Sequence, residues 1–403
     1  NENGKVIERI STTCRIQVEY LVLFKIIEIK KYKINNRRKS MIFYISSTII
    51  SVIFAYFSIY FSKININVTS LYNSKQKLRS IMKKMFAILS FLPLFIVSAI
   101  RYGVGTDYLL IYLPAFYYDF YTEGERFEVG FKLIVKLIRL FTSNYQWLFA
   151  ITSLIFAFFI YKAIYEQSSS PCFSIILLVL TNFYFISMDA IRQCISIAIF
   201  MYSIKYIKSN NFFKYLIFIL IAATMHKSVL VCIPIYFLYK RKVKLKTHII
   251  LLTITVISYN FISKAFIYIV GLTSYAGYFN SSYNTGKFGF LAFLINLSIL
   301  IFCYFLYHRC KDDEDYNIML NNQLIIIILS LFSSQIPLMS RIMWYFSFIV
   351  IIFLPKIINY IRNRYIRLYV KSSIIILYLI YMFYTIVIRG YHEVLPYKTF
   401  FGI

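Results

Sequence analysis

The chain has 403 residues, of which 60% are hydrophobic and 20% aromatic, and it carries a formal net charge of +28. A soluble globular protein of this size lacks the interior to bury so much apolar surface, so the composition predicts a membrane protein with several spanning helices. The basic residues are spread over short loops between apolar runs, which argues against nucleic-acid binding and favours contact with anionic lipid.

The first forty residues form a basic extension. They hold ten Lys or Arg against four acids, and their one apolar stretch, Tyr20–Ile29, is too short to span a membrane and contains Lys25 and Glu28. The first clean apolar run opens at Met41. We therefore expect residues 1–40 to be disordered or not native to the functional protein, and 41–403 to form a single polytopic membrane domain.

Apolar runs of about 20 residues predict spanning helices, so we expect an all-α fold with about twelve of them. The expected spans are 41–62, 83–100, 144–163, 171–187, 190–207, 212–226, 228–239, 247–270, 288–307, 320–338, 342–360 and 371–389.

Charge in the loops predicts the orientation of these spans, because cytoplasmic loops are enriched in Lys and Arg. One alternate set of loops carries most of the basic residues, and we assign it to the cytoplasm. It contains Lys63, Lys75, Lys77, Arg79, Lys83, Lys84, Lys205, Lys208, Lys214, the run 240–246, Lys356, Arg362, Arg364, Arg367 and Lys371. The opposite loops, which include 101–143 and 271–289, then face outward.

The outer segment 101–143 is the longest stretch without a span. Leu109–Tyr118 is apolar but too short to cross, which indicates a re-entrant or interfacial segment. Glu125–Phe141 has the periodicity of an amphipathic helix. Its polar stripe is Glu125, Glu128, Lys132, Lys136 and Arg139, and its apolar face is Phe127, Phe131, Ile134, Ile138 and Phe141. Such a helix could border a substrate with a lipid tail or serve only as a structural collar.

The run Phe212–Met225 is unusually short for a span. At 1.5 Å per residue it reaches about 21 Å, against a hydrocarbon core of about 30 Å. His226, which follows it, and Arg192, in a similarly short hairpin, would then lie at the floor of a crevice open to the outside. A polar floor below such an entrance suits a substrate with a lipid tail and a polar head.

Common cofactor and metal motifs do not occur in the sequence. The six cysteines show no CxxC spacing, the four histidines lie far apart, and there is no P-loop, GxGxxG or GxSxG. We therefore expect no metal and no cofactor.

Four charged or polar clusters fall at the outer ends of the expected spans. The first is the run from Arg101 to Asp107, where Gly103 and Gly105 permit unusual backbone geometry. Arg101 either pairs with Asp107 to fix a turn or binds phosphate through its planar guanidinium. In the second cluster, Asp189 lies one helical turn from Arg192 and either forms a local ion pair or leaves Arg192 for an anion, with Gln193 beside it.

The third and fourth clusters centre on His226 and on Ser340-Arg341. His226 is either a structural histidine or a group that orients or deprotonates a sugar hydroxyl. Arg341 is either an interface anchor or a further cation for a diphosphate. The acids Asp119, Glu123, Glu125 and Glu128 are interpreted as ordinary loop residues. Several cations in one low-dielectric crevice repel each other unless an anion joins them, which indicates an anionic ligand.

At these residues the chain resembles the EpsG family, the Wzy-type polymerases of bacterial exopolysaccharide and O-antigen. The resemblance covers about 41–400. It is carried by the span that starts at Met41, the run from Arg101 to Tyr108, Ile191-Arg192-Gln193 at the head of a span, Ala222–Ser228 around His226, Arg341 with its aromatic followers, and Leu395-Pro-Tyr397.

The resemblance implies an inner-membrane glycosyltransferase of exopolysaccharide, capsule or O-antigen synthesis, similar in kind to the GT-C class. Its substrate would be an oligosaccharide unit on undecaprenyl diphosphate at the outer face, and a chain-length regulator is a candidate partner. Under this hypothesis Arg101, Arg192 and Arg341 bind the diphosphate, and His226 positions or deprotonates the acceptor hydroxyl. Asp107 or Asp189 would hold an arginine in place, and Gly103, Gly105 and Gln193 would support the site.

Three other activities are compatible with part of this pattern. An O-antigen ligase uses the same donor with a different acceptor. A flippase or transporter of the lipid-linked unit should show internal repeats and polar residues at both faces or at the midplane, whereas the candidate residues here favour one face. An acyltransferase would need its histidine reachable from the cytoplasm, which the expected topology opposes.

Overall fold

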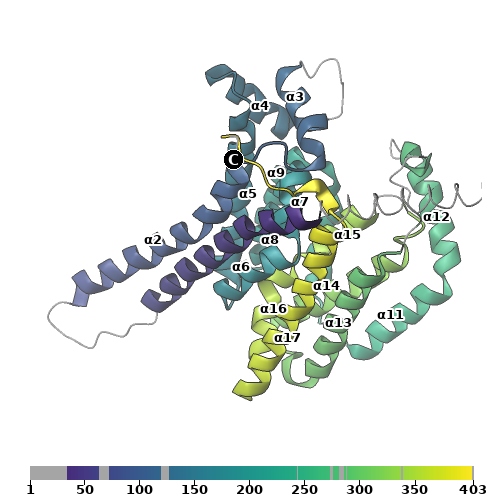
Figure 1. Ribbon diagram of the computed structural model, residues 1–403. Helices are drawn as coiled ribbons and strands as arrows, with labels where there is room; N and C mark the ends of the chain where they lie inside the picture. The colour runs from purple at the N-terminus through teal and green to yellow at the C-terminus, as the bar shows by residue number, and fades with distance from the viewer. Residues whose placement is uncertain are drawn as a thin grey trace, which may run out of the picture.

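The structure is a computed structural model. It describes residues 34–62, 72–118, 127–242, 244–272, 276–280, 286, 288–336 and 339–401. The regular secondary structure in this part of the chain is helical. Extended pairing among the described residues is limited to one isolated antiparallel bridge, between Arg101 and Thr399. The predicted all-α class is therefore confirmed for the described residues (Figure 1).

Five described helices are long and apolar enough to cross a membrane. They are Ile34–Ser62, α2 (Tyr72–Ala99), α5 (Gln146–Gln167), α13 (Phe290–Cys310) and α17 (Arg364–Met382), which continues as the π-helix η4 (Phe383–Ile388). This confirms that the chain is a polytopic membrane protein.

Three bent pairs of helices are also long and apolar enough together, which brings the number of candidate spans to eight if each pair is one span. The pairs are α6 (Pro171–Leu180) with α7 (Phe183–Asp189), α11 (Leu245–Ile257) with α12 (Tyr259–Gly271), and α15 (Met339–Ser347) with α16 (Val350–Asn359). The bends are 54°, 72° and 42°. In the first pair, Asn182 adopts a left-handed conformation (φ 69°), which ends α6 and turns the chain into α7.

The number twelve is not confirmed, because four expected spans fail the test of length or apolarity. α8 (Ile191–Lys208) contains three basic residues, and α9 (Phe212–Met225) has only 14 residues. The expected span 228–239 is divided into a 3-10 helix, η2 (Lys227–Cys232), and the short α10 (Ile235–Lys240). The expected span 320–338 is α14 (Glu314–Leu331), which begins earlier with two acids in its first turn.

The core surrounds α8. This helix is buried along almost its whole length and packs against α5 and α9, while all seven residues of α7 are buried beside it. α8 and α7 therefore lie in the middle of the bundle (Figure 1). Burial holds the first turn of α8 between its neighbours. Packing therefore fixes the position of Arg192 and Gln193, which lie in that turn.

Basic loop residues gather at the end of the bundle opposite to the start of α8. Nζ of Lys208 lies 2.7 Å from Asp315, Nζ of Lys356 lies 2.7 Å from Asp315 and 2.9 Å from Asp313, and Nζ of Lys205 lies 2.6 Å from Glu166. These contacts join the ends of α8 and α16 to the start of α14, and the end of α5 to α8. The sequence predicted this grouping, and which membrane face it occupies stays a prediction.

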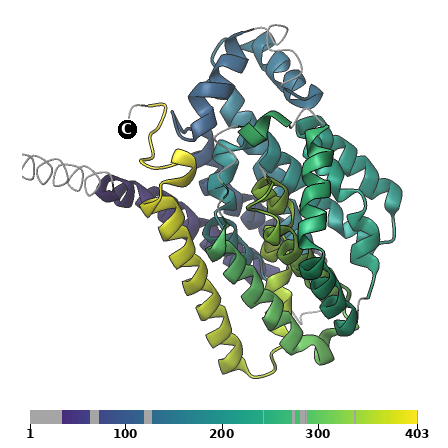
Figure 2. The ribbon, with the colours of Figure 1, turned by 90° about the vertical axis from the view of Figure 1, so that its right-hand side faces the viewer.

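The segment between Arg101 and α5 covers the other end of the bundle. It contains η1 (Tyr108–Tyr112), α3 (Leu113–Tyr117) and α4 (Val129–Phe141), which lie at the top of both views (Figures 1 and 2). α4 starts later than predicted. Its buried side is Phe131, Val135 and Ile138, with Phe127 before the helix, whereas Phe141 is 87% exposed. Of the predicted apolar face, Phe127, Phe131 and Ile138 are therefore buried against the bundle, and Val135 is buried with them although it was not predicted.

The first described helix, Ile34–Ser62, pairs with α2 in a long hairpin that extends from the body of the bundle (Figure 1). It begins before Met41, and Nη1 of Arg37 donates to the carbonyl oxygens of Val387 and Ile388, each at 3.3 Å. Residues 1–33 lie outside the described part of the chain. The domain boundary at residue 41 stays a prediction.

Candidate functional site

The four sequence clusters meet at one end of the bundle. The amide of Asp107 donates to Oδ1 of Asp189 at 3.0 Å, which joins the first cluster to the second. Nε2 of Gln193 donates to the carbonyl oxygen of Arg341 at 2.8 Å, which joins the second cluster to the fourth. Residues far apart in the chain thus converge where α7 ends and α8 begins.

Glu128 is the centre of the most densely charged part of this end. It occupies the N-cap position of α4, and its carboxylate turns inward rather than toward solvent. Oε2 accepts a hydrogen bond from Nη1 of Arg192, and Oε1 accepts from the amide of Lys227 at 3.2 Å. The side chains of Glu128 and Arg192 are only 11% and 15% exposed. A charge-assisted pair at this depth is strong because little water competes with it.

Aromatic rings hold Arg192 in place. Its guanidinium carbon lies 4.8 Å from the ring centre of Phe127 and 5.7 Å from that of Phe131. Both rings belong to the buried side of α4 and the residues before it, so packing of α4 orients the arginine at the same time as Glu128 pairs with it. The cation is therefore preorganised.

His226 adjoins the same carboxylate. It follows the last residue of α9, and its Nδ1 lies 3.7 Å from Oε1 of Glu128. Nδ1 also accepts from the amide of Ser228 at 3.4 Å and lies 3.1 Å from the Ser228 hydroxyl, which in turn lies 2.9 Å from the hydroxyl of Tyr345. Burial, together with the nearby Arg192 and Arg341, lowers the pKa of His226 to about 4, although the Glu128 carboxylate acts in the opposite direction. The imidazole is therefore neutral at physiological pH.

Arg101 lies in the interior, not at the surface. Its side chain is fully buried, and Nη1 donates to the carbonyl oxygen and hydroxyl of Ser98 and to the hydroxyl of Ser153. Nη2 donates to the carbonyl oxygen of Met188 at 3.3 Å. All these acceptors are neutral, so the predicted pair with Asp107 is not formed. Burial lowers the pKa of Arg101 from its ordinary value.

The glycines of the first cluster have different roles. Gly103 and Gly105 both have positive φ, at 60° and 103°. A Cβ on Gly105 would lie 2.8 Å from the carbonyl oxygen of Met188, whereas a Cβ on Gly103 would meet nothing within 4 Å. Gly105 is therefore required for the close approach of the turn to the end of α7.

Asp189 forms a pair that the sequence did not predict. The predicted alternative of a local Asp189–Arg192 pair is not formed, because Arg192 binds Glu128. Instead Oδ2 of Asp189 lies 2.6 Å from Nδ1 of His392, and the two side chains are 12% and 21% exposed. The ring of His392 also packs edge-on against Trp344 of α15, with the ring centres 5.8 Å apart. This places His392, from the C-terminal segment, beside the start of α8.

The C-terminal segment lies against the first cluster and is hydrogen-bonded to it. His392 and Glu393 have left-handed backbone conformations, at φ 64° and 47°, which are unfavourable for residues with a side chain and need support from the surroundings. Hydrogen bonds along the segment supply that support: Gly105 N to Glu393 O at 3.3 Å, Tyr44 Oη to Val394 O at 3.0 Å, Tyr102 N to Lys398 O at 2.9 Å, and Phe400 N to Ile100 O at 2.8 Å.

Gln193 and Arg341 complete the site. Gln193 is 2% exposed, and its Oε1 is buried without a hydrogen-bond partner among the described residues. Arg341 is half-buried in the first turn of α15, and it is close enough to His226 to lower the pKa of that ring. Both therefore lie with Arg192 and His226 at this end of the bundle.

Two partners in the site, Glu128 and His392, were not predicted from the sequence. Glu128 was interpreted as an ordinary loop acid, although its place at the start of an amphipathic helix was a usable signal. Nothing in the sequence near His392 distinguished it from the other histidines. Of the remaining acids, Asp119, Glu123 and Glu125 lie outside the described residues.

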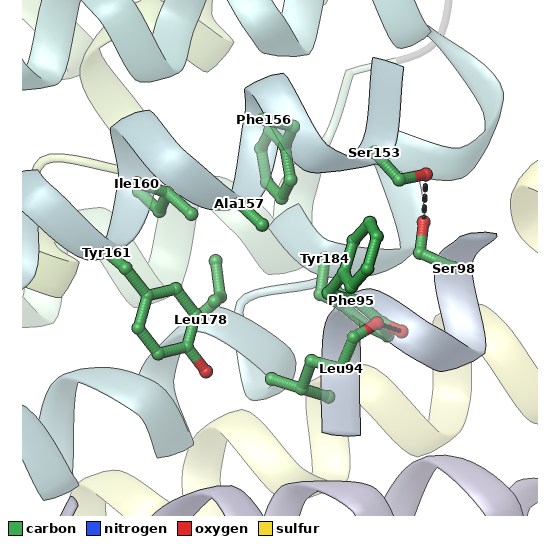
Figure 3. A pocket seen from close by; sticks show the side chains of 10 residues that line it. All are labelled: Leu94, Phe95, Ser98, Ser153, Phe156, Ala157, Ile160, Tyr161, Leu178 and Tyr184. Atoms are coloured by element: carbon green, nitrogen blue, oxygen red, sulfur yellow. Dashed lines mark hydrogen bonds between the residues drawn. The ribbon is translucent and has the colours of Figure 1, made fainter. Parts of the chain in front are cut away.

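A small cavity lies next to the partners of Arg101 but is unsuited to a substrate. It is lined mainly by apolar side chains of α2, α5 and α7, together with Ser98 and Ser153, whose hydroxyls are hydrogen-bonded at 2.8 Å (Figure 3). Its volume is about 10 Å³, which is room for about one water molecule. The predicted crevice beside His226 stays a prediction. The described residues contain no group of three or more His, Cys, Asp or Glu that could hold a metal.

Comparison with known proteins finds one family. The EpsG family model matches residues 84–399, which include every residue of the site. No curated protein matches the chain, and no solved structure matches it either.

Proposed function

The chain belongs to the EpsG family, a family of Wzy-type polymerases, and on this premise we propose that it joins lipid-linked oligosaccharide units into exopolysaccharide or O-antigen. The units would be carried on undecaprenyl diphosphate, and the reaction would take place at the outer face of the bacterial cytoplasmic membrane. A growing glycan on its lipid diphosphate is the donor, and a new lipid-linked unit is the acceptor.

The arrangement of Glu128, Arg192 and His226 is the observation that carries this proposal. Three segments distant in sequence bring a carboxylate, a guanidinium and a neutral imidazole together at one end of a membrane bundle, with Arg341 nearby. Transfer from a diphosphate needs cations for the charge that develops on the leaving group. It needs no metal in principle, because diphosphate is already a good leaving group.

Arg192 and Arg341 are the residues that we assign to the diphosphate. Arg192 is held on two aromatic rings and keeps its guanidinium partly exposed, so it can contact phosphate oxygens while Glu128 keeps it in place. Arg341 supplies a second cation from α15. Arg101 is fully buried and bonded to neutral groups, so we assign it to holding the Gly103–Asp107 turn instead of the diphosphate.

His226 is assigned a positioning role. Because a backbone amide can only donate, the hydrogen bond from the Ser228 amide makes Nδ1 an acceptor, and the neutral ring then carries its proton on Nε2. A ring in this form presents an N–H to a sugar or phosphate oxygen. Of the two predicted roles, orientation of the substrate therefore has more support than deprotonation.

The exposed side of α4 suits the lipid part of the substrate. Leu133, Leu137 and Leu140 are 55%, 48% and 76% exposed on the helix whose N-cap is Glu128. An apolar helix surface beside a cationic site can accommodate an isoprenoid chain next to its diphosphate.

Polymerisation by the purified protein tests the proposal. The protein would be reconstituted in liposomes with the lipid-linked unit extracted from cells that lack its gene, and products would be separated by gel electrophoresis. We expect a ladder of repeat units with the unaltered protein and with Lys242→Ala, which changes an exposed residue just after the end of α10. Arg192→Ala and Glu128→Gln should abolish the ladder while the protein remains folded.

The products also distinguish the alternatives. Transfer of single units to a different acceptor without a ladder would indicate a ligase. Movement of the unit across the bilayer with no new glycosidic bond would indicate a flippase. Either result would contradict the proposed polymerase.

A further inference from the structure

The described part of the site contains two imidazole–carboxylate pairs, and their rings are held in opposite ways. One pair is His226 with Glu128, and the other is His392 with Asp189. Asp189 ends α7 and Arg192 lies in the first turn of α8, so both pairs adjoin the start of α8. They are also linked through α15, because Trp344 packs on His392 and the hydroxyl of Tyr345 contacts Ser228 beside His226.

The partner of each Nδ1 determines what the other ring nitrogen can do. Nδ1 of His226 accepts from the Ser228 amide at 3.4 Å, so a neutral ring carries its proton on Nε2 and has no lone pair there. Nδ1 of His392 faces a carboxylate oxygen of Asp189 at 2.6 Å, and an ionised carboxylate can only accept. His392 therefore donates through Nδ1 and keeps the lone pair of Nε2.

Nε2 of His392 forms no hydrogen bond with the residues that the structure describes. The polar contact of the ring is with the Asp189 carboxylate, through Nδ1, and its aromatic contact is with Trp344. Its side chain is 21% exposed. An oriented imidazole with an available, partly exposed nitrogen has the form that general bases require.

We infer that His392 is the catalytic base of this site and that Asp189 is its positioning residue, an inference that rests on the proposed polymerase function. The acceptor hydroxyl oxygen forms a bond to the anomeric carbon of the donor, and its proton moves to Nε2 of His392. The bond between the anomeric carbon and the diphosphate oxygen breaks, and its electron pair leaves with the lipid diphosphate. Asp189 stabilises the imidazolium that results, and no other reactant is needed.

The position of Asp189 supports this division of roles. Its second oxygen, Oδ1, accepts from the Asp107 amide at 3.0 Å, so the carboxylate is held from both sides. The turn that supplies this amide depends on Gly105, which lies against the end of α7. Asp107 and Asp189, which were expected from the sequence to hold an arginine in place, would thus act through His392 instead.

A purely structural His392, which only fastens the C-terminal segment, is the competing explanation. Substitution of His392 by asparagine distinguishes the catalytic role from the purely structural one. Asparagine tolerates the left-handed backbone that residue 392 adopts, and its amide can still donate to Asp189, but it cannot take a proton. Glycine at this position also tolerates the backbone, and it leaves space that free imidazole can occupy.

The experiment measures polymerisation in liposomes by the full chain with the extracted lipid-linked unit. We expect His392→Asn to lower the rate about a hundredfold or more with an unchanged melting temperature. His392→Gly should be equally slow and should regain part of its rate when imidazole is added. Asp189→Asn should be slow without rescue by imidazole, and His308→Asn, an exposed histidine at the opposite end, should match the unaltered protein.

Three results would overturn the inference. A rate for His392→Asn within a few-fold of the unaltered protein would show that no proton is taken at this position. Failure of imidazole to restore any rate to a folded His392→Gly protein would leave only the structural explanation. Absence of polymer from the unaltered protein would overturn the proposed function, and the inference with it.

Discussion

Glu128 and Arg192 lie 64 positions apart in the chain, and their side chains form a direct, largely buried ion pair that joins α4 to the start of α8. The contacts of Glu128 extend beyond this pair. The same carboxylate also accepts from the Lys227 amide and adjoins His226, so one side chain fixes the relative positions of three segments of the site.

Removal of one partner of this pair should be more harmful than removal of both. Glu128→Ala leaves a desolvated guanidinium and should lower the free energy of unfolding by about 3 kcal/mol. The double variant Glu128→Ala/Arg192→Met should recover part of this loss. A double-mutant cycle on thermal unfolding in detergent would measure the coupling, which we expect to be about 1–3 kcal/mol. Additive effects would show that the two side chains do not interact.

Gly130 should be essential for the position of Glu128. A Cβ at residue 130 would overlap Oγ1 of Thr224 on α9 and would lie 2.8 Å from the carbonyl oxygen of that residue. Gly130→Ala should therefore push α4 from α9, at a cost of about 1–3 kcal/mol, and lower the polymerisation rate. Gly271→Ala is the matched control, because a Cβ there meets nothing within 4 Å. A Gly130→Ala protein as stable and active as this control would contradict the helix contact.

The hydroxyl of Tyr345 should affect activity as well as stability. It lies 2.9 Å from the Ser228 hydroxyl and 3.4 Å from that of Ser196, and Ser228 contacts the His226 ring. Tyr345→Phe should cost about 1 kcal/mol and reduce the rate through a misoriented His226. Tyr161→Phe removes a buried hydroxyl bonded to Ser90, away from the site. It should cost a similar stability without changing the rate per folded molecule.

Acid should destabilise the protein partly through His226. Its pKa is lowered, first by burial, to about 4, from an ordinary value of 6.5. Between these values the unfolded chain binds a proton that the folded chain does not. This stability contribution is therefore complete above about pH 6.5 and is lost as the pH falls, by at most about 1.4 kcal/mol per unit. Melting curves at pH 7.5 and 5.0 should show a larger decrease for the unaltered protein than for His226→Gln. Equal decreases in melting temperature for the two proteins would contradict the burial of the His226 ring.

The ion cluster at the opposite end should stabilise the fold without contributing to catalysis. Lys356 contacts Asp313 and Asp315, and Lys208 contacts Asp315. Asp315→Asn should lower the melting temperature in detergent, because Asp315 is buried, Lys208 loses the carboxylate that it contacts and Lys356 keeps only Asp313. The polymerisation rate per folded molecule should stay the same. If Asp315→Asn lowered the polymerisation rate and left the melting temperature unchanged, the ion cluster would have a role in activity.

Sequence patterns located the site better than they assigned its contacts. Charges at the ends of apolar runs are expensive unless they function or are paired, which is why Arg192, Gln193, His226 and Arg341 could be identified as neighbours. Their partners could not be identified, because Glu128 and His392 come from segments whose distance from α8 depends on how α4 and the C-terminal segment pack.

Helix periodicity and loop charge in the sequence determined the all-helical membrane class and the separation of basic loops from the site, since both follow from residue composition along one segment. The sequence also indicated that the chain around Gly103 and Gly105 can adopt unusual backbone geometry. Only the tertiary structure decided that Arg101 is buried, that Asp189 pairs with His392 instead of Arg192, and that Glu128 turns inward. A carboxylate can satisfy any nearby donor, and which donor is nearby is fixed by the packing of helices that are remote in the chain.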